Sequence, residues 1–110
     1  MLHAARYYEY FEEAFLQWLP ACGMHYDELV AMGVDLVIVE SRCTHRRPVR
    51  LNEVVTISVA PVHVGRRSLA VELGVSVGSE LAATGRITYV AVHDGRPAPL
   101  PPALASLAIG

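Results

Sequence analysis

The feature that most constrains this chain is a change of hydrophobic period at Gly33. Before it, apolar residues recur at spacings of four, three and four positions: Tyr7, Phe11, Ala14 and Trp18. That spacing predicts a helix over His3–Leu19 with one buried face. Pro20 and Gly23 follow as typical stop signals. Tyr26–Met32 is expected to add a short helical segment that ends at Gly33.

After Gly33, β-branched residues alternate with other residues in period two, which is typical of strands. Four strands are expected, at approximately 36–46, 55–59, 69–77 and 81–92. In the first strand, Leu36, Ile38 and Glu40 are expected to alternate with Val37, Val39 and Ser41. This part of the chain therefore predicts a sheet.

The connections between the later strands read as hairpins. Gly65–Arg67 and Gly78–Ser79 carry the residue types that favour tight turns. Four prolines within six residues from Pro97 predict an irregular tail over 97–110. A long helix followed by hairpin-joined strands predicts an α+β fold, with the helix lying across one face of an antiparallel sheet.

Length and composition exclude several classes of protein. The 110 residues fit one domain, 1–110. Charged residues make up only 18% of the chain and apolar residues 53%, so part of the surface is expected to meet another subunit. The net charge of -2 favours neither nucleic acid nor an anionic membrane as a partner. No apolar run is long enough to span a membrane and no signal-peptide pattern opens the chain, so a cytoplasmic location is expected.

Four stretches in order along the chain carry a family resemblance: His3–Phe15, Glu40–Pro48, Val64–Ser68 and Ala83–Arg86. Together they resemble hotdog-fold thioesterases of the 4-hydroxybenzoyl-CoA thioesterase-like family. The resemblance covers nearly the whole chain. It implies a hotdog fold, in which an antiparallel sheet wraps a long central helix. It also implies hydrolysis of an acyl-CoA or acyl-carrier-protein thioester by a homodimer joined edge to edge, or by a tetramer of dimers.

One part of the family pattern has no counterpart here. The family typically begins with a further strand and an Asp-x-x-Gly turn before the helix, and Met1 falls inside that turn. The first strand and the usual catalytic aspartate are therefore missing from this sequence, and either the chain is truncated or catalysis relies on another group. The alternative function is a non-catalytic hotdog domain that binds an acyl thioester or only dimerises. An acyl-thioester dehydratase ranks third, because no paired histidine and carboxylate is recognisable.

Three side chains are candidates for the missing base. The backbone N–H groups at the start of the helix could stabilise a thioester oxyanion, and His3 beside them could activate water. Glu9 and Glu13 stand four residues apart on one helix face and could reach the same cleft, whereas Glu12 is the remaining helix carboxylate. The competing interpretation is that these glutamates form a solvated face and that His3 is inert.

Arginines near the hairpins are candidates for binding coenzyme A, which enters only as part of the substrate. Arg47, Arg66 and Arg67 could pair with its phosphates, and Ser68 could add a contact. The competing interpretation is that they only solubilise the hairpin ends. No metal is expected. The pairs Cys22 with His25 and Cys43 with His45 lack the spacing of the ligands in zinc fingers or zinc ribbons.

Overall fold

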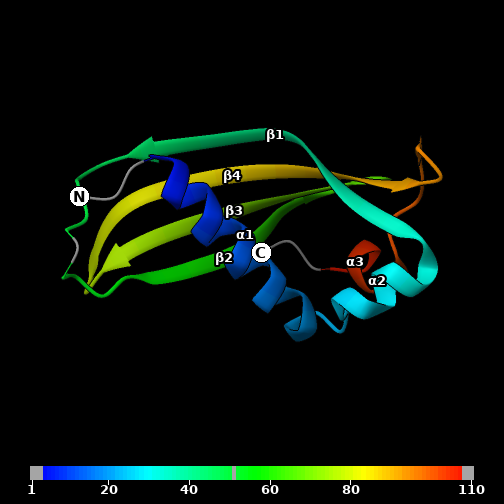
Figure 1. The fold of residues 1–110 in the computed structure, drawn as a ribbon, viewed down its shortest axis with the longest axis horizontal. Coiled ribbons are helices and arrows are strands. Elements are labelled where there is room, and N and C mark those ends of the chain that lie inside the picture. Colours follow the sequence, from blue (N-terminus) through cyan, green and yellow to red (C-terminus); the bar gives the residue numbers. More distant parts are fainter. Residues whose placement is uncertain (1–3, 51, 108–110) are drawn as a thin grey trace.

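The computed structural model describes residues 4–50 and 52–107, and for residues 4–9 it describes the backbone alone. In chain order the elements are α1 (Ala4–Ala21), α2 (Tyr26–Met32), β1 (Val34–His45), β2 (Thr56–Val64), β3 (Ser68–Val77), β4 (Glu80–His93), β5 (Arg96–Pro97) and α3 (Pro102–Ala105). The long strands curve around α1 (Figure 1). The predicted α+β architecture, a long helix wrapped by an antiparallel sheet, is confirmed.

The helices follow the predicted periodicity. α1 continues two residues past the expected end at Leu19 and carries Pro20 in its last turn. α2 ends at Gly33, which has a φ of 70° in the left-handed region that glycine adopts without Cβ strain. None of the helices in the part of the chain that the structure describes has the length and apolarity needed to span a bilayer.

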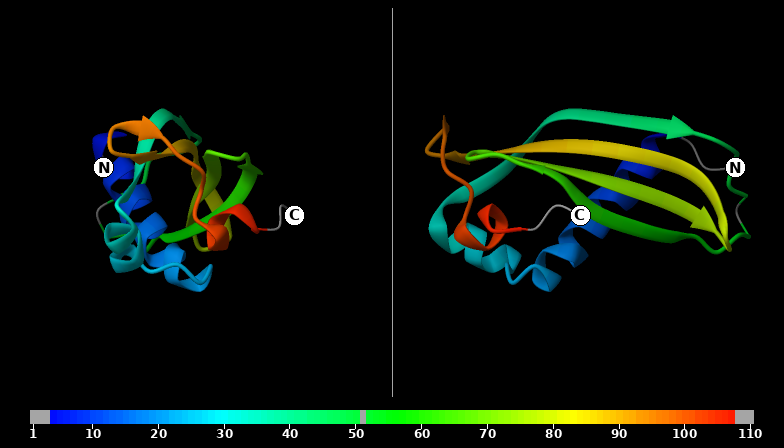
Figure 2. Two further views of the ribbon diagram at one scale, coloured as in Figure 1. Left: turned by 90° about the vertical axis from the view of Figure 1, so that its right-hand side faces the viewer. Right: turned by 180° about the vertical axis from the view of Figure 1, so that it is seen from behind.

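The sheet has the strand order β1-β4-β3-β2, and β5 pairs with β4. All pairs are antiparallel, and the two expected hairpins join β2 to β3 and β3 to β4. Figure 2 shows the sheet curving so that its concave face holds α1. β1 and β2 are the outer strands, and among the described residues neither has a strand on its outer edge.

The core lies between α1 and the concave face of the sheet. Phe11, Phe15 and Leu19 recur every four residues and are at most 4% exposed. Gly85 lies beneath the ring of Phe11, and a Cβ atom there would come within 2.8 Å of the Phe11 Cζ atom. A glycine at this point of β4 therefore lets the helix approach the sheet closely.

β1 departs from the uninterrupted alternation expected from the sequence. Its pairing with β4 shifts register between Ile38 and Glu40, so Val39 is the extra residue of a β-bulge. Directly paired residues point to the same face, and Tyr89, paired with Ile38, is in the core. After the bulge, the residues of β1 that face inward are odd-numbered instead of even-numbered. Ser41, for example, pairs with the buried Ile87 of β4. The residues of β1 after the bulge thus face the opposite side from the one that strict alternation predicts.

The tail predicted to be irregular contains two short elements, β5 and α3. Leu100 and Leu104 are 5% and 0% exposed, and Leu100 donates its N–H to the Arg66 carbonyl at 2.9 Å. The prolines permit this arrangement because one of them, Pro102, begins α3, where its missing N–H costs nothing. The prediction of an irregular tail is therefore wrong for these residues, whose apolar side chains complete the core.

Candidate active site

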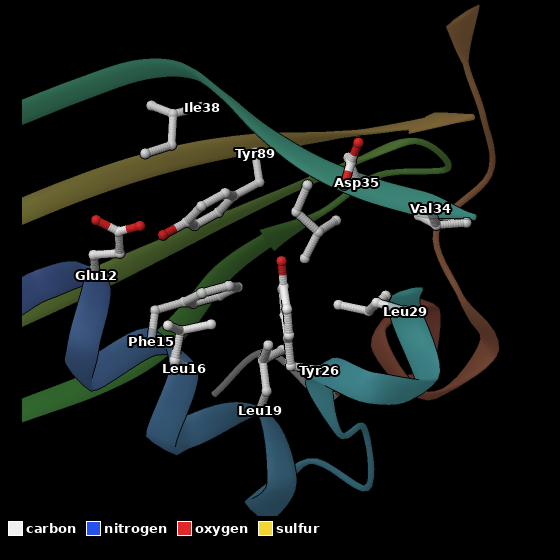
Figure 3. Close-up of a pocket in the computed structure, with 11 residues that line it drawn as sticks. Glu12, Phe15, Leu16, Leu19, Tyr26, Leu29, Val34, Asp35, Ile38 and Tyr89 are labelled. Carbon is white, nitrogen blue, oxygen red and sulfur yellow. The ribbon is translucent and has the colours of Figure 1, made fainter. Parts of the chain in front are cut away.

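An apolar pocket lies between α1, α2 and β1 (Figure 3). Its cavity volume is about 170 Å³. Most of its wall is apolar: Phe15, Leu16 and Leu19 from α1, Leu36 and Ile38 from β1, and Tyr89 from β4. Cavities of about 150 Å³ lined by such residues bind benzene, so this pocket can hold an aromatic ring or an alkyl group of similar volume.

Tyr89 places one polar atom inside this pocket. Its side chain is 4% exposed, and its ring stacks on Phe15 with the centroids 4.2 Å apart. The Tyr89 hydroxyl is buried and has no hydrogen-bond partner among the described residues. Burial, and secondly the charge of Glu12, raise the pKa of Tyr89 far above its ordinary value, so the phenol stays neutral. An unpartnered buried hydroxyl is costly in the free protein and is available to a ligand.

Glu12 and Glu13 lie on different sides of α1, one facing β1 and the other facing β2. Glu12 lines the pocket, and its carboxylate and the Tyr89 hydroxyl point toward one another (Figure 3). Glu13 instead lies in a shallower groove over β2 and accepts a 3.5 Å hydrogen bond from Gln17 Nε2. Of these two carboxylates, only Glu12 therefore reaches the pocket.

Glu12 and Tyr89 were not among the residues selected from the sequence. A signal for Glu12 was present, because Phe15, Leu16 and Leu19 follow it at three, four and seven residues, the spacing of one helix face. Tyr89 has the weaker signal of a hydroxyl-bearing side chain on the buried face of a strand. The remaining candidate bases are only partly visible: His3 lies outside the described residues, and Glu9 is placed on α1 by its backbone alone.

The predicted coenzyme-A-binding residues of the β2–β3 hairpin lie at one end of the sheet. Arg66 and Arg67 have exposed side chains, and their carbonyls accept hydrogen bonds of 2.9 Å from the Leu100 and Ala91 N–H groups. Ser68 is half-buried at the start of β3. The two guanidinium groups are thus presented to solvent on a hairpin that is anchored through its backbone.

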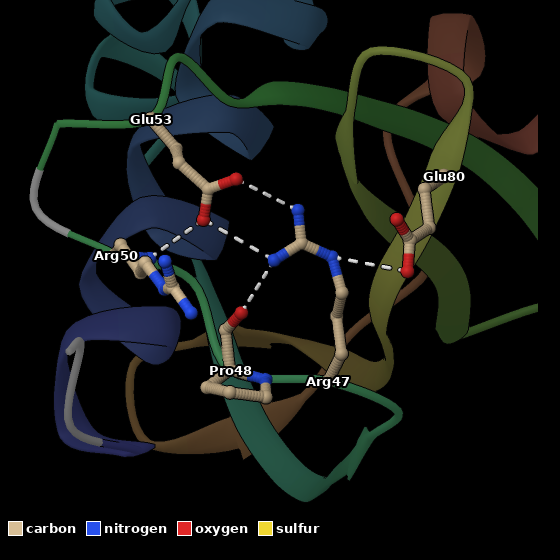
Figure 4. Close-up of polar contacts among 5 residues, drawn as sticks. All are labelled: Arg47, Pro48, Arg50, Glu53 and Glu80. Carbon is tan, nitrogen blue, oxygen red and sulfur yellow. Dashed lines mark hydrogen bonds and ion pairs between the residues drawn. The ribbon is translucent and has the colours of Figure 1, made fainter.

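Arg47 is in a different environment, held between two carboxylates (Figure 4). Its Nη2 and Nη1 atoms lie 2.8 and 3.2 Å from the Glu53 oxygens, and its Nε lies 3.2 Å from Glu80 Oε1. Hydrogen bonds from Arg47 and from the Arg50 backbone N–H lower the pKa of Glu53 from 4.5 to about 2. Arg47 therefore ties the β1–β2 connection to the start of β4, and its predicted contact with coenzyme A stays a prediction.

The two cysteine–histidine pairs do not form one metal site. No group of three or more histidine, cysteine or acidic residues is arranged to hold a metal ion within the described ranges. Cys22 follows α1, whereas Cys43 lies near the end of β1, and both thiols are free.

Comparison with known proteins gives a family. A family model described as "Thioesterase superfamily" matches residues 1–81. A curated protein of Aquifex aeolicus (strain VF5), named "Putative esterase", is 30% identical over 54 residues. That match covers 49% of this chain and 42% of the other, so the chain spans less than half the length of the curated relative it matches.

Solved structures agree with that family. A hypothetical protein from Thermus thermophilus is 29% identical, with a TM-score of 0.90 over 97% of this chain and 86% of the other. A thioesterase from Thermus thermophilus, solved with coenzyme A and Zn, is 31% identical, with a TM-score of 0.78 over 94% and 75% of the two chains. The hotdog fold inferred from the sequence motifs is confirmed. The chain belongs to the thioesterase superfamily.

Proposed function

We propose that this protein hydrolyses an acyl thioester of coenzyme A or of an acyl carrier protein to a free acid and a thiol. The observation that carries the proposal is the apolar pocket beside α1 in a member of the thioesterase superfamily. A fold by itself assigns no reaction, whereas a partly open apolar pocket with one buried hydroxyl suits the acyl part of such a substrate.

The first turn of α1 would polarise the thioester carbonyl. The described part of α1 begins at Ala4, and the backbone N–H groups at the N-terminus of a helix have no intrahelical acceptors. Together with the helix dipole, such groups stabilise the negative charge that develops on the carbonyl oxygen. His3, Glu9 and Glu13 stay predicted candidates for the base.

The parts of this proposed site lie at opposite ends of one protomer. The hairpin with Arg66 and Arg67 lies at the far end of the sheet from the first turn of α1 (Figure 1), in a molecule 41 Å long. A twofold axis beside β1 would reverse one protomer relative to the other. It would thereby bring the first turn of one helix near the hairpin and the pocket of the partner, and Arg66, Arg67 and Ser68 would then bind the coenzyme A of a substrate shared between protomers.

The distribution of apolar surface supports a homodimer joined along β1. Of the nine exposed large apolar side chains that the structure describes, seven belong to α1, α2 and β1: Leu16, Tyr26, Val30, Met32, Val37, Ile38 and Val39. Exposed apolar side chains concentrated on neighbouring elements are typical of a protein interface, and β1 also has an open edge among the described residues. A tetramer of two such dimers is the larger assembly that we propose. A cytoplasmic location is supported by the free thiols.

A non-catalytic acyl-thioester-binding domain is the alternative, because one fold hosts many functions and assigns no reaction by itself. The test is thiol release from short-chain, medium-chain and aryl acyl-CoAs by the purified chain. We expect turnover that depends on the acyl group, because the pocket volume is limited. Thermal stabilisation by acyl-CoA without thiol release would favour the alternative, and neither effect would contradict both functions.

A further inference from the structure

Two side chains near the end of β1 form a cysteine–histidine pair. Cys43 Sγ lies 3.6 Å from His45 Nε2, within hydrogen-bonding distance for a thiol. The two residues are two positions apart on one strand, so they share a face. The bulge at Val39 turns that face inward, because Cys43 pairs with Gly85, which lies beneath Phe11.

This cysteine–histidine pair lies at the same end of the molecule as the start of α1. His45 is the last residue of β1, and Figure 1 draws that end of the strand and the first described turn of α1 at the same end of the molecule. His45 is exposed and Cys43 is half-buried, so a solvent-borne substrate can reach them. The pair therefore lies at the end of the molecule where the backbone N–H groups of the first described turn of α1 would polarise the thioester carbonyl.

The chemistry of the thiol explains why the histidine matters. Burial raises the pKa of the Cys43 thiol, so the sulfur stays protonated unless a base removes the proton. The thiolate is the reactive nucleophile, and a histidine in contact with a cysteine is a common way to generate it. Burial also raises the pKa of Cys22, yet Cys22 makes no hydrogen bond to a histidine among the described residues. Cys22 is thus a matched control.

We propose that Cys43 is the nucleophile and His45 its general base in the thioester hydrolysis proposed for this protein, a function on which this inference rests. His45 Nε2 takes the thiol proton, and Cys43 Sγ forms a bond to the carbonyl carbon. The bond from that carbon to the substrate sulfur then breaks, and the leaving thiolate takes the proton from His45. The acyl group is now a thioester of Cys43.

The second half of the reaction releases the acid. His45 Nε2 takes a proton from a water molecule, and the water oxygen forms a bond to the carbonyl carbon. The bond to Cys43 Sγ breaks, and the Cys43 thiolate recovers the proton from His45. No oxidant or further reactant is consumed. The first half exchanges one thioester for another, so it breaks and forms bonds of the same kind.

The direct test is detection of the acyl group on Cys43. The Cys22→Ala variant, which keeps Cys43 as its only cysteine, is mixed with acyl-CoA, quenched in acid and analysed by intact-protein mass spectrometry. We expect one acyl group per chain, removed by neutral hydroxylamine as a thioester should be. The matched Cys43→Ala variant should carry none. An equal adduct on both variants would contradict the proposal. So would the absence of an adduct from the Cys22→Ala variant, measured with an acyl-CoA that is hydrolysed slowly enough for the adduct to be trapped.

Turnover of the variants gives a second readout. Cys43→Ala and His45→Gln should each lower kcat by about 100-fold or more, the usual range for removing a nucleophile or its base. Cys22→Ala should stay within about twofold, as expected for a residue outside the reaction. Melting curves show whether each variant is folded. A folded Cys43→Ala variant with full turnover would overturn the inference and leave the proposed function standing.

Alkylation tests the cysteine–histidine pair independently of the proposed function. Iodoacetamide should modify Cys43 faster than Cys22, and His45→Gln should remove most of that difference while the Cys22 rate stays unchanged. A wild-type protein that releases no thiol but shows this dependence on His45 would refute the proposed function and support the pair. Equal alkylation of the two cysteines in the wild-type protein would contradict the pair itself.

Discussion

The two flanks of α1 differ in what they can bind. Between α1 and β1 the side chains enclose an apolar pocket that contains the buried Tyr89 hydroxyl. Between α1 and β2 they form a more open groove, where Glu13 and Gln17 are exposed and hydrogen bond to each other. A polar atom on the first flank is removed from water, whereas polar atoms on the second remain hydrated. The β1 flank is therefore better suited than the β2 flank to the apolar part of a ligand.

The largest expected effect is on stability and comes from Phe15. Phe15 is 4% exposed and stacks on Tyr89, so Phe15→Ala should lower the free energy of unfolding by about 3–5 kcal/mol. Urea-induced unfolding measures the change. Trp18→Ala is the control from the groove flank, and its half-buried side chain should cost less. Equal losses would mean that the two flanks are packed alike.

Filling each flank with a bulky side chain tests which one receives the acyl group. Leu16 and Gln17 are neighbouring exposed residues of α1 that line the pocket and the groove, respectively. Leu16→Trp should lower kcat/KM for medium-chain acyl-CoA by about tenfold, equivalent to about 1.4 kcal/mol. Gln17→Trp should leave it within about twofold. The reverse order, measured by thiol release, would assign the acyl group to the groove.

Removing the buried hydroxyl should stabilise the free protein. Tyr89→Phe deletes a buried polar atom that has no partner in the described part of the chain, so the free energy of unfolding should rise by about 1 kcal/mol. Tyr10→Phe, on the groove flank, should change it by no more than about 0.5 kcal/mol. Urea titration of both variants measures the difference. A loss of stability in Tyr89→Phe would show that the hydroxyl has a partner.

The β1–β2 connection, which contains Glu53, contributes to stability in a way that depends on pH. The pKa of Glu53 falls from 4.5 to about 2 on folding, so its contribution to stability is complete above pH 4.5 and disappears as the pH falls through 2. The wild-type melting temperature should therefore exceed that of Glu53→Gln at pH 7, by an amount that shrinks toward pH 2. Scanning calorimetry measures it. A difference that does not change with pH would refute the ion pair with Arg47.

The sequence predicted most of the fold, because its elements are locally encoded. The recurrence of Tyr7, Phe11, Ala14 and Trp18 predicted α1, and the period-two runs predicted the four long strands, of which β2 extends five residues past its expected end. The folded tail was missed. Its order depends on long-range contacts of Leu100 and Leu104 with a core that no local pattern reveals.

The candidate site was less predictable, and the bulge at Val39 is the main reason. Strict alternation would place Cys43 and His45 on the same face as Val37, away from the helix, whereas the extra residue turns both toward it. No turn-forming residue or proline at this point of the sequence indicates a bulge. Glu12 was overlooked for a different reason: its neighbour Glu13 has the same chemistry, and only the tertiary structure separates the two flanks.

The most direct test of this account is a crystal structure with a stable thioether analogue of a medium-chain acyl-CoA. We predict that the alkyl chain lies between Phe15, Leu16 and Ile38, with the Tyr89 hydroxyl in contact with the ligand or with a water that it orders. An alkyl chain bound in the groove beside Trp18 and Ile57, with the β1 flank empty, would contradict it.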